Sequence, residues 1–316
     1  MIEKNHFKRI LITGSGGFIG KNLTRELSRD YLVDGLDLPG LQSKDLNTFY
    51  TWDDLKIMPK YEIIIHLAGK AHDLKDVAKI DEYFEVNVGF TKKIMDFFID
   101  QEFGKFIFFS SVKSVADFLD GKLLTEDFIP KPLTAYGKSK LAAERYLLGN
   151  NPSPQQNIYI LRPCITHGPG NKGNLNLLHK LVAKGIPYPL GAYHNQRSLL
   201  SVYNLIWVLR SIIEKPVPSG IYNIADDEPL STNEIVEMIA ESAGKKRKIW
   251  RVPISVVNAF GRLGDVLEFP LNTERIKKLT ESYIVYNDKI KKALDVDILP
   301  LSSREGLRRT FESMSK

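Results

Sequence analysis

The sequence predicts an α/β protein with a Rossmann-like, doubly wound parallel sheet and a smaller, interleaved C-terminal domain. Through the first half of the chain, short apolar runs alternate with segments of helical spacing. Strands that are apolar throughout are buried on both faces, as in a parallel sheet covered by helices on each side. The second half is richer in Gly, Pro and Asn and has shorter elements, which is typical of loops that build a binding surface. We expect the boundary near residue 165, with some later segments returning to the first domain.

The individual elements follow from the periodicity of apolar residues. Continuous apolar runs predict strands over residues 9–13, 31–38, 62–67, 106–109 and 158–161. Apolar positions at helical spacing predict helices over residues 18–29, 81–102, 134–148, 204–214, 231–243 and 304–314. The amphipathic stretch 253–269 is interpreted as a lid or packing helix rather than as a helix that touches a membrane surface.

Composition argues against several classes of protein. No run of about 18 apolar residues is present, so we expect no integral membrane segment, and MIEKNHFKRI lacks the apolar core of a signal peptide. The single cysteine, Cys164, cannot form an internal disulfide, which is typical of a reducing compartment, and we expect a cytoplasmic protein. The net charge of +6 indicates a solvated surface with a modest lysine excess, or attraction to an anionic substrate such as a diphosphate.

Nucleic acid and metal ions are not expected as partners. The chain has no arginine-rich run, zinc-finger spacing or ribonucleoprotein motif. His72, His179 and His194 have no Cys, Asp or Glu at ligand spacing, so we predict no metal site. His66 stands in a predicted strand and is interpreted as a core histidine, and Cys164 as a small buried hydrophobe.

A glycine-rich loop separates the first predicted strand from the first predicted helix. Gly14, Gly17 and Gly20 have the spacing that permits a tight turn, a close approach of backbone to a pyrophosphate, and close packing of helix on sheet. Phe18 and Ile19 begin the helix, whose N-terminal amides would face the negative charge. The strand–turn–helix context therefore predicts a dinucleotide-binding loop.

An acidic residue ends the second predicted strand. Asp37 lies 23 positions after Gly14. A carboxylate there can accept hydrogen bonds from the adenosine ribose hydroxyls and would repel a 2′-phosphate. We therefore expect the cofactor to be NAD(H) rather than NADP(H).

Tyr136 and Lys140 stand four residues apart in YGKSK, on one face of a predicted helix. A phenol titrates near about 10 and is a poor base at neutral pH. An ammonium group one turn away favours the phenolate and lowers the phenol pKa, so Tyr136 can exchange a proton with a substrate hydroxyl during hydride transfer. Lys140 can also reach the nicotinamide ribose. Ser110 and Ser111 follow the strand 106–109, where they are placed to donate a hydrogen bond to the substrate oxygen.

These residues occur in motifs that resemble those of a known family. The chain resembles extended short-chain dehydrogenases/reductases of the nucleotide-sugar epimerase/dehydratase group. The matching motifs are the glycine motif TGSGGFIG (13–20), the fourth-strand motif HLAG (66–69), the Asn-x-x-x-Thr motif NVGFT (87–91), the serine-strand motif SSVKSV (110–115) and the catalytic motif YGKSK (136–140). The resemblance covers nearly the whole chain. It implies an NAD(P)-binding Rossmann domain over residues 1–165 that carries Ser, Tyr and Lys. Residues 166–316 would mainly bind the substrate.

The resemblance also implies roles for single residues in the first domain. Ser111 is similar to the catalytic serine, Tyr136 to the base and Lys140 to the ribose-binding lysine. Asp45 and Leu46 would flank the adenine. The cofactor path would further include Leu67, Ala68, Asn87 and Pro163.

In the second half, the resemblance implies a site for a UDP-sugar. Asn174 and Leu175 would hold the diphosphate and base, and Tyr188 and Leu190 would lie against uracil. Arg197 would clamp the diphosphate, because a guanidinium can bind phosphate oxygens with two parallel hydrogen bonds. A surface ion pair is the alternative interpretation of Arg197.

Three further residues complete the expected substrate-binding set. Ser110 and Lys113 belong to the serine-strand motif, and His167 occupies a loop position where relatives often have tyrosine. Helices 81–102 and 134–148 resemble those that form a dimer interface in relatives, which implies a homodimer. Packing on the sheet would explain their apolar faces equally well.

The substrate half bears on the reaction. UDP-galactose 4-epimerases usually carry Arg-Tyr-Phe-Asn where this chain has RPCI (162–165). The set SSVKS, GPGNKGN, PYPLG and NQRSL is closer to bacterial reductases of UDP-4-keto-6-deoxy-N-acetylhexosamines, of the UDP-N-acetylquinovosamine type, which serve surface polysaccharide. The resemblance therefore favours 4-keto reduction. A UDP-glucose or UDP-N-acetylglucosamine 4-epimerase with tightly held NAD is a close alternative.

Two other interpretations are weaker. Dehydratases of the family place Asp-Glu beside the catalytic serine, whereas this chain has Val112 and Lys113. A catalytically idle NAD-binding regulator is a remote alternative, because Ser111, Tyr136 and Lys140 are all present.

Overall fold

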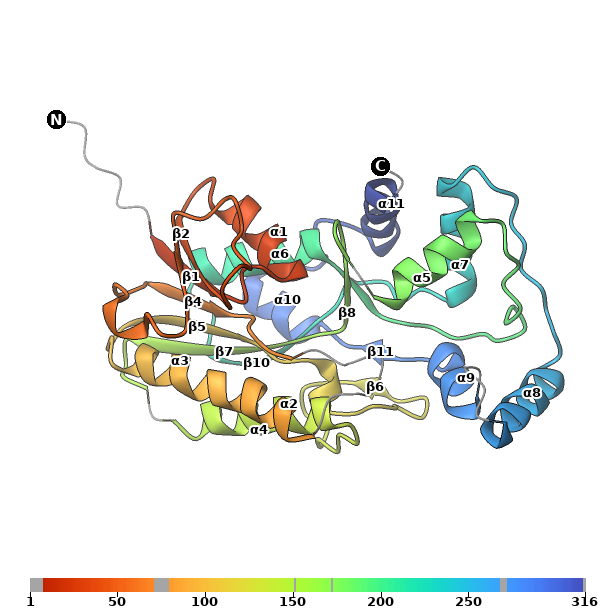
Figure 1. The fold of residues 1–316 in the computed structure, drawn as a ribbon, viewed down its shortest axis with the longest axis horizontal. Coiled ribbons are helices and arrows are strands. Elements are labelled where there is room, and N and C mark those ends of the chain that lie inside the picture. The colour runs from red at the N-terminus through yellow and green to blue at the C-terminus, as the bar shows by residue number, and fades with distance from the viewer. Residues whose placement is uncertain (1–7, 71–79, 151, 172, 268–271, 315–316) are drawn as a thin grey trace.

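The main sheet of the protein determines where its predicted site residues meet. The computed structural model describes residues 8–70, 80–150, 152–171, 173–267 and 272–314. Within these residues the main sheet has seven parallel strands, in the order β10 (Gly220–Ile224), β7 (Gln156–Pro163), β5 (Gly104–Phe109), β4 (Ile63–His66), β1 (Arg9–Thr13), β2 (Leu32–Leu36) and β3 (Thr48–Tyr50). The order runs outward in both directions from the centre, so the crossovers carry helices on both faces. The predicted doubly wound α/β fold is confirmed (Figure 1).

Shorter elements complete the described chain. Two small parallel pairings join β6 (Leu123–Leu124) to β11 (Ile284–Val285) and β8 (Ile165–His167) to β9 (Leu199–Ser201). The helices are α1 (Phe18–Leu27), α2 (Ile80–Phe84), α3 (Phe90–Ile99), α4 (Ala135–Leu148), α5 (Asn174–Ala183), α6 (Val202–Glu214), α7 (Thr232–Ser242), α8 (Ile254–Val266), α9 (Thr273–Thr280), α10 (Asp288–Leu294) and α11 (Ser303–Met314). Among the described residues, no helix has both the length and the apolarity needed to cross a bilayer.

Alternate residues of each strand serve the two faces of the sheet. Ile10 and Ile12 of β1 belong to the core that also contains side chains of α1, α6 and α10, whereas Leu11 belongs to the core of α3 and α4. Figure 1 shows the same division, with α1, α6 and α10 on one side of the sheet and α2, α3 and α4 on the other. Both faces of the sheet are therefore covered, which explains why its central strands are mainly apolar.

The predicted helix over residues 81–102 is divided. α2 and α3 are joined by a π-helical turn at Glu85–Gly89. Such a turn adds a residue to the helical repeat, and π turns frequently occur at functional sites. This one carries Asn87, which the motif comparison assigns to the cofactor path.

Segments after residue 165 contribute to both parts of the molecule. β10 pairs with β7 as an edge strand of the main sheet, and α6 packs on that sheet. α5, α7 and α11 share a separate core that includes Ile239, Leu307 and Phe311. The C-terminal half is thus interleaved with the first, while the boundary at residue 165 stays a prediction.

Truncation of the central strand tests this architecture. Leu11 is fully buried between two neighbouring strands and beneath α3 and α4. We expect Leu11→Ala to lower the free energy of unfolding by about 2–5 kcal/mol, because a cavity remains where the side chain was. Urea unfolding measures the loss. Ile57→Ala, at a position that is 75% exposed, is the matched control and should change the free energy by less than about 0.5 kcal/mol. Equal losses in both variants would contradict the burial pattern.

Candidate active site

The predicted site residues of the first domain gather at one edge of the main sheet. Gly14 follows β1, Asp37 follows β2, Leu67 follows β4 and Ser110 follows β5, while Pro163 ends β7. Carboxyl ends of parallel strands lie at the same edge, where open α/β sheets bind their ligands. The fold thus brings together residues that are far apart in the sequence.

The glycine loop has the geometry of a phosphate cradle. Gly14 has φ of 71°, and a Cβ there would lie 2.8 Å from the amide nitrogen of Ala68. A Cβ on Gly20 would lie 2.7 Å from Cα of Ser15, so the close packing of α1 on the loop also requires glycine. α1 starts just after Gly17, which offers no side chain to its first amides, and these amides can therefore bind an anion. The loop fits the pyrophosphate of a dinucleotide.

The Asp37 carboxylate lies against the same loop. Its Oδ2 accepts a hydrogen bond from the amide of Gly16 at 2.8 Å, and its Oδ1 accepts one from the amide of Leu38 at 2.8 Å. Each carboxylate oxygen can accept a second hydrogen bond, so Asp37 can still bind ribose hydroxyls. Asp45 is exposed nearby in the chain, and Leu46 packs against the core.

The segment after β4 passes directly beside Lys140. A Cβ on Gly69 would lie 2.8 Å from Oδ1 of Asn87 and 3.0 Å from Nζ of Lys140. Asn87 is fully buried; it accepts a hydrogen bond from the amide of Lys70 at 2.7 Å and donates one to Oγ of Ser139 at 2.9 Å. Asn87 therefore ties the segment after β4 to the helix α4. Through these hydrogen bonds it holds the backbone at the carboxyl edge of the sheet.

Tyr136 lies in the first turn of α4 and contacts Ser111. Thr134 caps this helix, and its hydroxyl accepts a hydrogen bond from the amide of Gly137. Burial raises the pKa of Tyr136, a hydrogen bond with Ser111 lowers it, and Tyr83, whose ring centroid lies 6.4 Å from that of Tyr136, raises it. The net shift is upward. The lowered pKa expected from the spacing to the lysine is therefore wrong for this structure, because burial outweighs the favourable contacts.

Lys140 points toward the end of β5. Its Nζ donates a hydrogen bond to the carbonyl oxygen of Phe109 at 2.9 Å and lies 4.9 Å from the ring centroid of Phe108. Burial lowers the pKa of Lys140 to about 8, and the negative charge of Glu144 acts against this shift. The side chain thus remains mainly protonated at neutral pH, beside the segment that follows β4.

A buried ion pair that sequence reasoning missed lies next to Lys140. Arg162 donates from Nη2 to Oε2 of Glu144 at 2.6 Å and from Nε to Oε1 at 3.0 Å. The Arg162 and Glu144 side chains are only 3% and 1% exposed. The hydroxyl of Ser114 donates to Oε1 at 2.6 Å, and that of Ser110 donates to the same oxygen. One carboxylate therefore joins α4, the end of β7 and the segment after β5.

This network corrects the expected role of Ser110. Its hydroxyl is buried and bonded to Glu144, so it holds the serine segment in place instead of facing a substrate. Ser111, the next residue, is partly exposed and contacts Tyr136. Two signals in the sequence pointed to the ion pair. Glu144 stands four residues after Lys140 on the same helix face, and Arg162 is a charge directly after the apolar run 158–161, where it requires a partner.

Basic side chains gather beside the first turn of α4. Nζ of Lys113 donates to the carbonyl oxygen of Asp117 at 2.8 Å and lies 4.4 Å from the ring centroid of Tyr283. Burial lowers the pKa of Lys113, the charges of Asp117 and Glu281 raise it, and Arg197 lowers it further. Arg197 in turn donates to the carbonyl oxygens of residues 278 and 281. The two cations are close enough that the charge of Arg197 affects the pKa of Lys113.

The remaining substrate-side residues have mixed environments. Burial raises the pKa of Tyr188 to about 12, while Arg197 acts to lower it. The side chain of Leu190 is buried against α8 and α9, so this residue would meet a base through its backbone. Asn174 begins α5, and its side chain lies outside the described part of the structure; Leu175 packs at the edge of the core of α5, α7 and α11.

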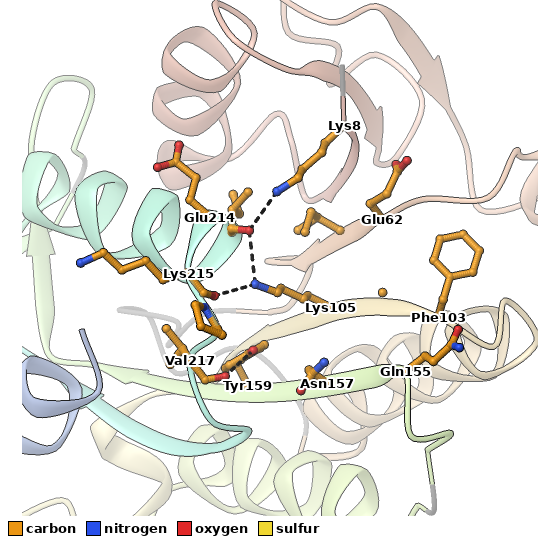
Figure 2. Close-up of a pocket in the computed structure, with 14 residues that line it drawn as sticks. Lys8, Glu62, Phe103, Lys105, Gln155, Asn157, Tyr159, Glu214, Lys215 and Val217 are labelled. Atoms are coloured by element: carbon orange, nitrogen blue, oxygen red, sulfur yellow. Dashed lines mark hydrogen bonds between the residues drawn. The ribbon is translucent and has the colours of Figure 1, made fainter. Parts of the chain in front are cut away.

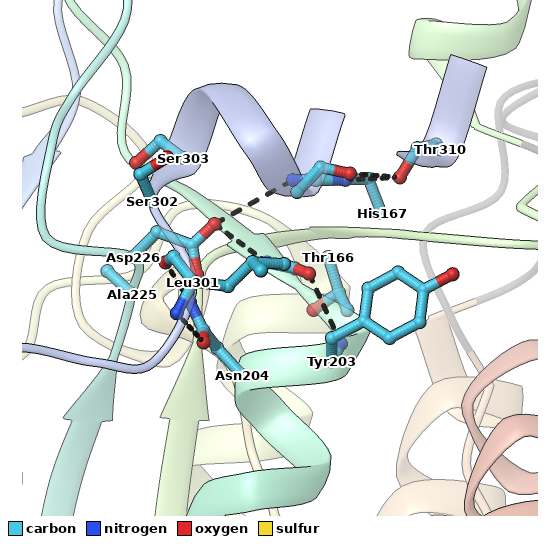
Figure 3. Close-up of polar contacts among 12 residues, drawn as sticks. Thr166, His167, Tyr203, Asn204, Ala225, Asp226, Leu301, Ser302, Ser303 and Thr310 are labelled. Atoms are coloured by element: carbon cyan, nitrogen blue, oxygen red, sulfur yellow. Dashed lines mark hydrogen bonds and ion pairs between the residues drawn. The ribbon is translucent and has the colours of Figure 1, made fainter. Parts of the chain in front are cut away.

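His167 is not a pocket residue, contrary to its expected role. It is fully buried, with Nδ1 2.8 Å from Oγ1 of Thr310 and Nε2 3.8 Å from Oδ2 of Asp226 (Figure 3). Gly306 lets α11 approach closely, since a Cβ there would lie 2.8 Å from Cβ of Ser201. The helix α11 therefore covers the side chain that sequence reasoning assigned to the sugar.

A cavity of about 580 Å³ lies at the opposite, N-terminal edge of the main sheet (Figure 2). Nζ of Lys105 donates there to the carbonyl oxygens of Ile212, Ile213 and Lys215 at 2.6, 3.2 and 2.9 Å, and Nζ of Lys8 donates to that of Ile213 at 3.3 Å. Cations are favourable at the C-terminus of a helix. These lysines cap α6, and the cavity is remote from the predicted site.

Two minor interpretations hold. His66 is fully buried between the hydroxyls of Thr13 and Thr91, at 2.6 and 3.0 Å, and burial lowers its pKa well below the usual range, as expected of a core histidine. Cys164 is buried, and burial raises its pKa, as expected of a small hydrophobe. Within the described residues, no group of three or more potential ligands is arranged to hold a metal ion; His72 lies outside them.

Comparison with known proteins supports the same picture. Residues 10–225 match the model of the NAD dependent epimerase/dehydratase family. The chain is 33% identical over 274 residues to the UDP-glucose 4-epimerase of Vibrio cholerae, in an alignment that covers 81% of this chain and 82% of that protein. It is 26% identical over 320 residues to the N-acetyl-alpha-D-glucosaminyl-diphospho-ditrans,octacis-undecaprenol 4-epimerase of Escherichia coli O157:H7, with coverage of 96% and 94%. The UDP-glucose 4-epimerase of Thermus thermophilus, solved with NAD, has a TM-score of 0.75 at 22% identity, with coverage of 97% and 99%.

The parallel sheet, with a glycine loop at its carboxyl edge, defines the Rossmann-fold class of dinucleotide-binding proteins. More narrowly, the chain belongs to the NAD dependent epimerase/dehydratase family. The family resemblance drawn from the motifs is thereby confirmed, whereas the UDP-N-acetylquinovosamine type is not decided by it.

The Glu144–Arg162 ion pair yields a stability prediction. Glu144→Gln leaves the Arg162 guanidinium buried without an anionic partner, and we expect the free energy of unfolding to fall by about 3–5 kcal/mol in urea titrations. The double variant Glu144→Leu/Arg162→Met removes both charges and should recover most of the loss. Arg145→Gln, on the exposed side of the same helix, is the control and should be nearly neutral. A double variant as unstable as Glu144→Gln would contradict this account.

The pKa of Lys140 yields a prediction on pH. Burial lowers this pKa from 10.5 in the unfolded chain to about 8 in the folded protein. Between about pH 8 and pH 10.5, Lys140 is therefore protonated in the unfolded chain but deprotonated in the folded protein. The contribution of Lys140 to the free energy of unfolding should therefore rise with pH through this window and stay constant below about pH 8. Urea titrations at a series of pH values measure it as the difference between wild type and Lys140→Met. Lys138→Met, at an exposed position of α4, should show no such rise, and a flat difference for Lys140→Met would refute the buried ammonium.

Proposed function

We propose that the protein carries out redox chemistry at C4 of a UDP-sugar, specifically the reduction of a UDP-4-keto-6-deoxy-N-acetylhexosamine for surface polysaccharide. The observation that carries the C4 chemistry is the contact between Tyr136 and Ser111 beside the buried Lys140. Relatives named above act on UDP-glucose, which supports a UDP-sugar as the substrate. The carboxylate of Asp37 at the glycine loop supports NAD(H) over NADP(H).

The roles of the residues follow from their environments. A nicotinamide dinucleotide, when bound, would supply the hydride. Ser111 would donate a hydrogen bond to the substrate carbonyl oxygen, and Tyr136 would give this oxygen its proton. Burial raises the pKa of Tyr136, so its phenol carries at neutral pH the proton that reduction requires. Lys140 would hold the ribose of the cofactor through its ammonium group.

The substrate side supports a phosphorylated ligand. Lys113 and Arg197 bring two partly buried cations to the same region, and phosphate oxygens are the groups that such cations bind best. Val112, which is buried, and Lys113 occupy the place of the carboxylic acids of dehydratases, so elimination of water is not supported. A homodimer through α3 and α4 remains part of the proposal.

The second candidate is 4-epimerization with tightly held NAD. Two relatives favour it, because the Vibrio cholerae and Escherichia coli proteins are both 4-epimerases. In that reaction Tyr136 would act first as a base and then as an acid. The phenol would have to lose its proton before the first of these steps.

A substrate test separates the two candidates. We expect purified protein to oxidise NADH in the presence of UDP-4-keto-6-deoxy-N-acetylglucosamine. The loss of absorbance of the reduced cofactor measures this reaction. Incubation with UDP-N-acetylglucosamine or UDP-glucose, with no cofactor added, should give no 4-epimer. Mass spectrometry of the denatured protein should find no stoichiometric NAD. Efficient epimerization without added cofactor, together with bound NAD, would establish the epimerase instead.

The same assay tests the proton donor. Tyr136→Phe removes the phenol hydroxyl and should lower kcat/KM by about 10²–10⁴-fold. Tyr146→Phe is the matched control on α4, since its hydroxyl donates to Asp96 and not to Ser111, and it should retain activity. If Tyr136→Phe left every activity and phenotype unchanged, an idle NAD-binding regulator would become the better description.

A further inference from the structure

One face of the helix α8 is uncovered and apolar. Val256, Phe260, Leu263 and Leu267 recur at intervals of four, three and four residues, so they share one side of the helix and its end. Their side chains are 40%, 62%, 48% and 51% exposed. A contiguous apolar surface of this kind is unusual on a protein that has no partner there.

The opposite side of α8 is already packed. Val257 is buried in a cluster with Leu190 and with Ile276 of α9. A Cβ on Gly261 would lie 2.7 Å from Cδ1 of Ile276, so the two helices are in close contact. The exposed stripe is therefore not the face that attaches α8 to the protein. The interpretation as a packing helix accounts for one face and leaves the stripe unexplained.

The chain that leads into α8 is basic. Between Glu241 and Asp265 the sequence has six Lys or Arg residues and no Asp or Glu. Arg247 pairs with Glu237, and the other five are exposed: Lys245, Lys246, Lys248, Arg251 and Arg262. Trp250, in the same stretch, is 59% exposed. Figure 1 shows this stretch running from α7 along one side of the molecule to α8.

We propose that α8, with residues 245–251 before it, binds the surface of a bilayer that contains anionic phospholipid. The apolar stripe would enter the boundary between headgroups and acyl chains, as amphipathic interfacial helices do. Trp250 would lie at the same level, and the lysines and arginines would contact the lipid phosphates. With 13 residues α8 is too short to span a bilayer and lies on it instead.

The charge pattern favours a membrane over a second copy of the chain. A symmetric dimer through α8 would place the same patch of each protomer opposite itself. That arrangement would bring the five exposed cations of one chain close to those of the other. The sequence between Glu241 and Asp265 contains no carboxylate that could neutralise them. An anionic lipid surface neutralises these cations while it covers the stripe.

Membrane binding through α8 would also orient the substrate-side half. Tyr188 and Leu190 pair through their backbones with Ile249 and Arg251. The predicted nucleotide-binding segment would thus lie next to the bilayer. This inference does not rest on the proposed reaction, because its test measures binding and not turnover.

Vesicle co-sedimentation tests the proposal on the full chain. We expect the protein to co-sediment with vesicles of phosphatidylcholine and phosphatidylglycerol, much less with phosphatidylcholine alone, and less at high salt because salt screens the cations. The double variant Phe260→Ser/Leu263→Ser should weaken binding at least about tenfold. Ile57→Ser/Ile298→Ser is the control: it also replaces two exposed apolar side chains by serine, at positions far from α8 in the sequence. This variant should bind like wild type.

Charge reversal supplies an independent arm. Lys246→Glu and Arg251→Glu should each weaken binding to the anionic vesicles by roughly fivefold, and thermal unfolding checks that every variant folds. Failure of the wild type to bind either kind of vesicle would overturn the proposal. So would binding that the Phe260→Ser/Leu263→Ser variant leaves intact, or light scattering that shows a dimer which this variant dissociates, since a second copy would then cover the stripe.

Discussion

The Glu144 carboxylate is the point at which three segments of the candidate site meet. It accepts hydrogen bonds from Arg162 at the end of β7 and from Ser110 and Ser114 after β5, while its own backbone belongs to α4. Removing a carboxylate from water costs several kcal/mol, and only a complete set of donors offsets this cost. The network therefore ties α4 to the end of β7 and to the segment after β5. In that arrangement the Tyr136 phenol reaches Ser111.

The same carboxylate acts on the charge of its neighbour. Lys140 is buried, and desolvation lowers its pKa to about 8, whereas the negative charge of Glu144 favours the protonated form. Without an anion so close, a buried ammonium would lose its proton more readily. The ion pair thus contributes both to the position of α4 and to the charge that this helix presents at the carboxyl edge of the sheet. Glu144 therefore influences both the structure and the electrostatics of the site.

The two halves of the molecule use different means to form their surfaces. In the first half, the surface forms where backbone segments approach closely. Gly14 contacts the segment after β4, and Gly69 leaves space for Asn87 and Lys140. In the second half, side-chain networks such as that of His167, Asp226 and Thr310 anchor α11 over the small sheet of β8 and β9 (Figure 3).

Local patterns in the sequence determined the fold class and the first half of the site. Apolar runs, the glycine spacing and the Tyr136–Lys140 spacing are features of residues that are close in the sequence. They can therefore be recognised without a structure. Only the tertiary structure decided which side chains meet across the sheet. It turned Ser110 toward Glu144, paired Glu144 with Arg162, and covered His167 with α11. It likewise decided which face of α8 is packed and which is open, because periodicity predicts that a helix has two faces but not what lies against each of them.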